Sequence, residues 1–216
     1  PSAIRFGIRH ERHDPASVNA NFALFASDSI QFRGNPTIQP GNYTMLNGEF
    51  RYQFTPFRRI STGGFIFTGT HAIDGLSESS FTQATFQTFV RITTLPLWRL
   101  DMRFSGGWSW GDIPPQRFFS LESSIASTAG DGVLRGMNVK EFYGDRFAAL
   151  SLEHSFGEVI PGVLRIPSIA SFGIEFILTG SLAWTDFSQG ARLLQALPST
   201  AQTQDIYYYE AGIALN

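Results

Sequence analysis

Residues 10–14 read His-Glu-Arg-His-Asp and group side chains that bind metal ions or transfer protons. Two histidines beside carboxylates are common ligands of a divalent metal. The flanking residues, however, predict a strand over 3–13, and three residues apart on a strand His10 and His13 point to opposite faces. One ion could then be held only across a bulge. We therefore interpret the segment as the polar end of a strand and predict no metal site.

Hydrolytic chemistry by a membrane barrel would need a serine nucleophile and a histidine base. His71 and His154 are the available bases, and no G-x-S-x-G nucleophile motif occurs. His154 falls among apolar alternating positions near a strand end, where an interfacial histidine is ordinary. We predict that the chain is not an enzyme and uses no cofactor. The absence of cysteine excludes thiolate metal sites, and a net charge of −2 gives no reason to expect nucleic acid as a partner.

The remaining charged side chains are arranged by a period-2 alternation, which is clearest from Trp98 to Trp110. Even positions are Trp98, Leu100, Met102, Phe104, Gly106, Trp108 and Trp110, and odd positions are Arg99, Asp101, Arg103, Ser105, Gly107 and Ser109. Thirteen alternating residues exceed a usual soluble strand and match a tilted membrane strand with aromatic residues at both interfaces. Together with Arg51 and Arg91, which alternate in the same way, Arg99, Asp101 and Arg103 are the predicted lumen charges.

The same alternation predicts nine strands. They are placed at 3–13, 18–26, 46–54, 57–70, 84–92, 98–110, 146–156, 172–184 and 205–216. Links between them alternate in length, with short links at 14–17, 55–57 and 94–97, a medium one at 157–170, and long ones at 27–42, 71–81, 111–145 and 187–204. Outer-membrane barrels have this pattern, with short turns inside and long loops outside. It predicts that strand 3–13 runs toward the periplasm.

Composition supports the barrel interpretation. Charged residues make up 16% of the chain and hydrophobic residues 43%, with 21 Phe and 21 Gly, as expected when each strand has a lipid face and a wet face. No charge-poor apolar run reaches the roughly 18 residues of a membrane helix. We therefore predict an all-β, antiparallel, up-and-down transmembrane β-barrel. Residues 1–216 form one domain that is incomplete at both ends, because bacterial barrels have an even number of strands.

The longest link contains Leu134-Arg135-Gly136-Met137, and the strand after it contains Ser151-Leu152-Glu153-His154. This pairing resembles the BamA-like outer-membrane assembly and translocation superfamily (bacterial surface antigen family), whose sixth outer loop carries a (V/I)-R-G-(F/Y) motif followed by an S-L-E-F-like strand. Leu134 and Met137 depart from the motif at its ends. The resemblance implies strands six to fourteen of a sixteen-stranded barrel.

In that superfamily the loop folds into the lumen and its arginine contacts acidic residues of the inner wall. The resemblance therefore makes Glu153 and Glu175 the candidate partners of Arg135. A guanidinium cannot be deprotonated and needs acceptors wherever it is partly dehydrated. Leu178 stands where the superfamily usually offers an inward aspartate, which implies that part of the anchoring network is missing or has moved to Glu175.

Three functions fit these observations. The resemblance implies a barrel in the bacterial outer membrane that assists the insertion or translocation of polypeptides. Its partners would be membrane lipid, unfolded outer-membrane or secreted polypeptides and accessory lipoproteins. The alternatives are a passive porin or channel, in which the lumen charges set ion preference, and the barrel anchor of a patatin-like lipase.

Overall fold

The computed structural model describes residues 2–15, 37–55, 61–96, 98–121, 134, 136, 142–157, 175–188, 196–197 and 207–215. The elements are β1 (Ser2–His13), β2 (Gly41–Phe54), β3 (Ser61–Ala72), β4 (Phe81–Leu95), β5 (Trp98–Gly111), the 3-10 turn η1 (Pro115–Arg117), β6 (Phe119–Ser120), β7 (Tyr143–Gly144), β8 (Arg146–Ser155), β9 (Phe176–Asp186) and β10 (Tyr208–Leu215). Among these residues no helix is long and apolar enough to cross a membrane.

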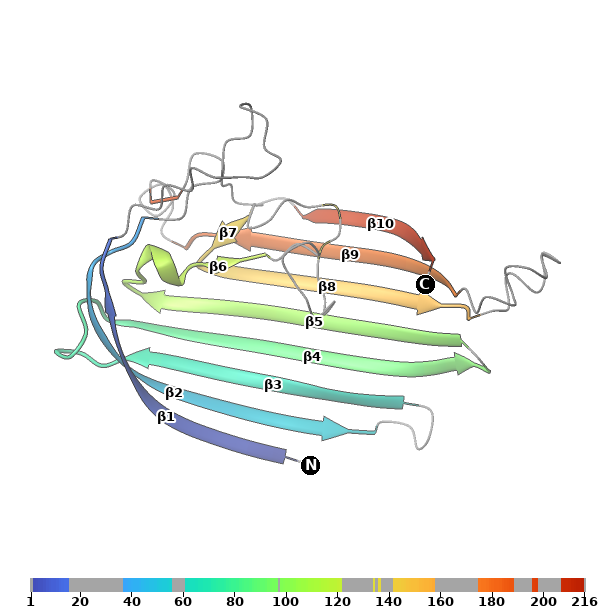
Figure 1. Ribbon diagram of the computed structural model, residues 1–216, viewed down its shortest axis with the longest axis horizontal. Helices are drawn as coiled ribbons and strands as arrows, with labels where there is room; N and C mark the ends of the chain where they lie inside the picture. The colour runs from blue at the N-terminus through green and yellow to red at the C-terminus, as the bar shows by residue number, and fades with distance from the viewer. Residues whose placement is uncertain are drawn as a thin grey trace, which may run out of the picture.

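Eight of the strands form one antiparallel sheet, in the order β1-β2-β3-β4-β5-β8-β9-β10 (Figure 1). Each strand therefore pairs with its neighbour in the chain, apart from the small β6–β7 pair that lies between β5 and β8 in sequence. The strand ends that are joined by residues 55–60, 96–97 and 156–175 lie at one end of the sheet, which we call the short-link end. The strand ends that are joined by residues 14–40, 73–80, 112–145 and 187–207 lie at the other, which we call the long-link end. The predicted all-β antiparallel fold is confirmed.

The first part of the chain differs from the prediction. β1 pairs directly with β2, from Ser2 opposite Tyr52 to His13 opposite Gly41, so no strand separates them in the sheet. The strand predicted at 18–26 lies outside the described residues. Because β1 is antiparallel to β2, it runs in the same direction as β3 and β5. With a strand at 18–26 between them, strands 3–13 and 46–54 were predicted to run in the same direction, and that prediction was wrong. Alternation identifies the faces of a strand but not its partner, which depends on nonlocal pairing.

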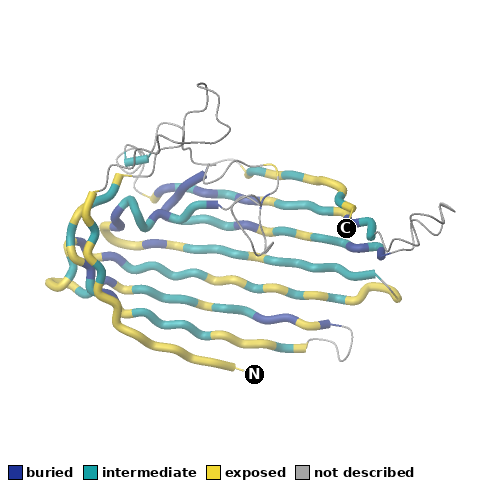
Figure 2. Tube along the Cα trace, viewed as in Figure 1, coloured by how far each residue is buried: buried dark blue, intermediate teal, exposed yellow. Residues whose placement is uncertain are grey.

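The sheet has two chemically distinct faces, as the alternation predicted. Continuous registers bring side chains of equal parity to the same face, so that Phe104 lies between Thr88 and Leu150 while Ser105 lies between Gln87 and Ala149. We call the face of Phe104 the apolar face and the face of Ser105 the polar face. Side chains along the edge strand β1 are exposed over nearly its whole length (Figure 2).

The apolar face is exposed across the whole sheet. Its exposed large side chains are Ile4, Phe6, Ile8, Leu46, Tyr52, Phe67, Phe86, Phe104, Trp108, Trp110, Leu150, Leu152, Leu178, Leu182, Tyr209, Ile213 and Leu215. In the part of the chain that the structure describes, both clusters of buried hydrophobic residues include segments of the links packed on the opposite face. A water-soluble sheet of this size would cover one such face with a second layer.

The polar face is concave at the long-link end. η1 follows β5, yet Arg117 forms an ion pair with Glu11 of β1. In a flat sheet the four strand spacings between β5 and β1 would separate these residues by about 19 Å. The contact therefore requires strong curvature, and the bend of β1 and β2 is visible in Figure 1.

A buried apolar cluster closes the concave side at this end. It consists of Tyr43, Met45, Ala72, Phe81, Ile113, Phe118, Tyr143 and Phe187. Nearby, the buried carboxylate of Asp145 accepts the backbone N–H of Ser188 at 2.9 and 3.0 Å and also its hydroxyl. The links at this end are thereby tied to the sheet and to one another.

Candidate binding site on the polar face

Charge is distributed unevenly over the polar face. Its arginines in the described strands all lie on β1, β2, β4 and β5, and they are Arg5, Arg9, Arg51, Arg91, Arg99 and Arg103. The carboxylates of β1–β5 on this face are Glu11, Glu49 and Asp101, whereas β8–β10 carry Glu153 and Glu210. One half of the face therefore has a net positive charge and the other half a net negative charge. All five predicted lumen charges lie on this face.

Asp101 is the centre of the densest charged group. Arg91, its partner across β4 and β5, donates from Nε at 2.6 Å and from NH2 at 3.2 Å in a two-pronged contact. Arg99 donates from Nε at 3.0 Å to Oδ2 of the same carboxylate, the oxygen that also accepts NH2 of Arg91. The Asp101 side chain is largely buried while both arginines are about half exposed. One carboxylate thus balances two guanidinium groups, which leaves an excess of positive charge.

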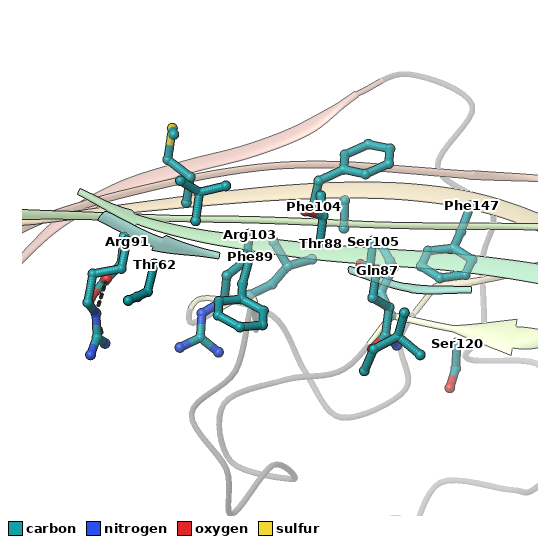
Figure 3. A pocket seen from close by; sticks show the side chains of 17 residues that line it. Thr62, Gln87, Thr88, Phe89, Arg91, Arg103, Phe104, Ser105, Ser120 and Phe147 are labelled. Atoms are coloured by element: carbon teal, nitrogen blue, oxygen red, sulfur yellow. Dashed lines mark hydrogen bonds and ion pairs between the residues drawn. The ribbon is translucent and has the colours of Figure 1, made fainter. Parts of the chain in front are cut away.

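A cavity of about 590 Å³ lies beside this group, between the polar face and segments of the β5–β8 link. Its sheet side includes Gln87, Phe89, Arg91, Asp101, Arg103, Ser105, Phe147 and Ala149, and its link side includes Ser120, Leu121 and Leu134. Figure 3 shows Arg91, Phe89 and Arg103 projecting from the same side of the sheet. The cavity therefore combines cationic groups with apolar and aromatic surface.

Two aromatic rings border the cavity, and glycines give them room. Phe89 lies opposite Gly64 in the register, and a Cβ on Gly64 would come within 2.9 Å of its ring. A Cβ on Gly107 would come within 2.6 Å of the Phe147 ring and 2.8 Å of the Phe119 ring. Side chains larger than glycine would push these rings off the sheet.

Parts of the predicted loop motif lie on the polar face. Leu134 is 2% exposed and packs with Ala149 and Ala183, on β8 and β9. The backbone N–H of Gly136 donates to Oε2 of Glu210 on β10 at 2.7 Å. Arg135 and Met137 lie outside the described residues, so the predicted contact of Arg135 stays a prediction.

The two candidate partners of Arg135 occupy different positions. Glu153 lies on the polar face, opposite Asp101 in the register of β5 and β8. Glu175 precedes β9, and its carboxylate accepts the hydroxyl of Ser155 at 3.1 Å. Leu178 lies on the apolar face and is exposed, so the position compared with the superfamily's inward aspartate does not face the polar side.

The segment 10–14 is divided between the two faces, as its alternation predicted. His13 contacts Glu11 on the polar side at 3.0 Å, and Glu11 also receives Arg117. Nδ1 of His10 is hydrogen-bonded at 2.9 Å to the hydroxyl of Thr44, its partner in the register of β1 and β2. Within the described ranges no three His, Cys, Asp or Glu side chains gather closely enough to hold a metal ion.

The two candidate bases also have threonine partners. His71 contacts the Thr82 hydroxyl at 2.9 Å, and His154 contacts that of Thr94 at 3.1 Å. His154 is additionally packed edge-on against the rings of Trp98 and Phe156. These surroundings resemble those of interfacial aromatic side chains.

Several residues of the site were not predicted from the sequence. Phe89 is 41% exposed on the polar face, where alternation favours polar side chains. An aromatic residue at such a position departs from the alternation, and this departure could have identified Phe89 from the sequence. Arg117 and Glu210 gave no such signal, because their contacts join segments 106 and 74 residues apart. Neither a protein-family model nor a curated protein sequence matches this chain.

Proposed function

We propose that this chain forms part of a transmembrane β-barrel in a bacterial outer membrane, with the apolar face toward lipid and the polar face toward the lumen. The supporting observation is the apolar face itself, which carries Phe6, Phe104, Trp110 and Leu182 among many exposed large hydrophobic side chains. Soluble monomers rarely expose apolar patches beyond a few hundred Å². Lipid is the solvent in which such a face is stable, and closure of the sheet would satisfy its edge strands.

Aromatic side chains gather at both ends of the apolar face, as in the two girdles of membrane barrels. At the long-link end Trp108 and Trp110 lie 6.4 Å apart, and the Arg146 guanidinium sits over Trp108 at 5.0 Å and Trp184 at 5.7 Å. At the short-link end Trp98 lies 4.9 Å from Phe156. Between the two belts the face is aliphatic and phenylalanine-rich, which fits a hydrocarbon layer.

The more specific part of the proposal is that the barrel belongs to the BamA-like superfamily and assists the insertion or translocation of polypeptides. It is supported by the Leu-Arg-Gly-Met motif and by the position of its described residues. Leu134 is buried on the polar side and Gly136 is bonded to Glu210. A link held inside the concavity is what the resemblance implies for the superfamily's sixth outer loop.

Tryptophan quenching tests the orientation of the apolar face, since all four tryptophans of the chain lie on it. The full-length protein, with these four residues as its only tryptophans, would be refolded into vesicles of brominated phosphatidylcholine. We expect strong quenching when bromine is near the glycerol level, weaker quenching when it is near the chain ends, and little quenching by aqueous acrylamide. Efficient acrylamide quenching with no effect of bromine would refute the membrane proposal.

The translocation part is tested by a separate assay. Vesicles containing the full-length protein should accelerate the folding of a urea-unfolded outer-membrane polypeptide relative to vesicles without it. Arg135→Ala should abolish the acceleration while leaving the β-sheet circular dichroism unchanged, and Arg5→Ala, on a strand remote from the motif, serves as the control. A double-mutant cycle of Arg135→Ala with Glu153→Gln should give a coupling above ~0.5 kcal/mol. No acceleration by the unmodified protein, in vesicles where the tryptophans are quenched by bromine, would leave a barrel without this activity.

A further inference from the structure

We propose that the cavity beneath the β5–β8 link is a binding site for a small organic anion with a compact apolar body, such as an aromatic or short-chain carboxylate. The proposal concerns the polar face alone and does not depend on translocation activity. It rests on the charge of the lining, on two ring-bearing walls and on the size of the enclosed space.

The charge of the lining favours an anion. Among the described residues that line the cavity, the cations are Arg91 and Arg103 and the carboxylate is Asp101, which is also shared with Arg99. The contact with Asp101 uses two of the five N–H donors of Arg91. Among the described residues, and with Glu153 opposite Asp101 included, three arginines face two carboxylates. A ligand carboxylate would be attracted by this excess of cations and could accept charge-assisted hydrogen bonds from a planar guanidinium.

The walls favour an apolar body attached to that anion. Phe89 remains 41% exposed on the polar face, and it borders the cavity beside Arg103. Phe147 and the link residues Leu121 and Leu134 supply the opposite apolar surface. Gln87 and Ser105 line the floor between them and offer neutral hydrogen-bonding groups. A ligand that covers the exposed ring would remove its apolar surface from water, which is favourable.

The size of the cavity limits the ligand. About 590 Å³ lies within the range of roughly 300–1,000 Å³ typical of small-molecule sites. It is too small for a folded domain and suits a molecule of one ring or one short chain.

Three matched probes test the proposal. 4-Phenylbutyrate, 4-phenylbutan-1-ol and 4-phenylbutylamine share a phenyl ring and a four-carbon chain, and their head groups are anionic, neutral and cationic respectively. Their binding to the full-length protein in phosphatidylcholine nanodiscs would be measured by equilibrium dialysis, with protein-free nanodiscs subtracted. We expect the carboxylate to bind at least tenfold more tightly than the alcohol and the amine to bind most weakly. Arg103→Gln should reduce the preference for carboxylate over alcohol at least fivefold, and Phe89→Ala should weaken all three probes alike.

The matched control is Arg5→Gln, which removes a cation from the same face but outside the cavity lining, and it should leave the preference unchanged. Equal binding of the three probes, tightest binding of the amine, or no binding of any probe would overturn the proposal. So would an equal loss of preference in Arg5→Gln and Arg103→Gln. If Arg103→Gln does not fold, the comparison of probes on the unmodified protein and on Phe89→Ala still decides. Quenching of the tryptophans by brominated lipid is independent of these outcomes, so failure of this proposal is distinguishable from failure of the membrane proposal.

Discussion

Replacing Phe104 by arginine tests the assignment of the two faces most directly. Phe104 lies at the middle of β5, is 39% exposed on the apolar face and packs against Phe86 with ring centroids 6.3 Å apart. The nearer end of the strand is six residues away, or roughly 20 Å, which is farther than an arginine side chain can reach toward water. The guanidinium would therefore stay in the hydrocarbon layer.

The expected cost has two parts. An arginine at the midplane of a barrel's lipid face costs about 2–4 kcal/mol. Loss of the aromatic pair with Phe86 adds about 0.5–1.5 kcal/mol. We therefore expect Phe104→Arg to lower the free energy of unfolding by roughly 3–5 kcal/mol, most of it from the buried charge.

Reversible urea unfolding of the full-length protein in vesicles measures this free energy. The control is Ser105→Arg at the neighbouring position. Ser105 lines the cavity on the polar face, and the cavity has room for the longer side chain. It should lower the free energy of unfolding by less than about 1 kcal/mol, a cost typical of a surface substitution. If both substitutions cost the same, or if only Ser105→Arg is destabilising, the face assignment is wrong.

Three further predictions concern contacts that hold the links to the sheet. Arg117→Ala should increase amide hydrogen exchange in 112–121 without changing exchange in the eight-stranded sheet. In a double-mutant cycle with Glu11→Gln the coupling energy should exceed ~0.5 kcal/mol, and additive effects would mean that the pair does not hold the link. Gly107→Ala should lower the free energy of urea unfolding by about 1–3 kcal/mol, because two rings occupy the space that the alanine methyl group needs. The control Gly7→Ala should be close to neutral, because a methyl group there would meet nothing within 4 Å. Asp145→Asn should lower the free energy of unfolding by about 1–3 kcal/mol in the same measurement, because the buried Asp145 carboxylate accepts hydrogen bonds from Ser188. An unchanged free energy would mean that this contact does not stabilise the protein.

Much of the sheet could be predicted from alternation because each face has its own solvent requirement. The strand predicted at 98–110 is observed as Trp98–Gly111, and that at 146–156 as Arg146–Ser155. Alternation was least informative over 57–70, where Phe65, Ile66 and Phe67 are consecutive, and there the strand is Ser61–Ala72. The glycine at 111, with φ of 85°, ends β5 one residue beyond the predicted boundary.

Pairing and tertiary contacts were harder to predict. The four residues 14–17 looked like a tight turn, and only the register of β1 with β2 shows that no strand separates the two in the sheet. The charges of the site were identified individually, but the two-pronged contact of Arg91 with Asp101 depends on which residues of β4 and β5 lie opposite each other. Contacts such as Arg117 with Glu11 arise from curvature of the sheet, which no local pattern encodes.

The chain-order pairing of the sheet has a consequence for how the protein folds. Neighbouring strands of the large sheet follow one another in chain order, so the sheet can grow by adding strands without reordering. The step from β5 to β8 is the slowest to form on entropic grounds, because it closes 34 residues (112–145) where the step from β4 to β5 closes two (96–97). For a flexible chain, closing the longer link costs about 2.5 kcal/mol more free energy than closing the shorter one. The hairpins β4–β5 and β8–β9 are therefore expected to form before they join, and the residues that line the cavity on β4, β5 and β8 come together only in that late step.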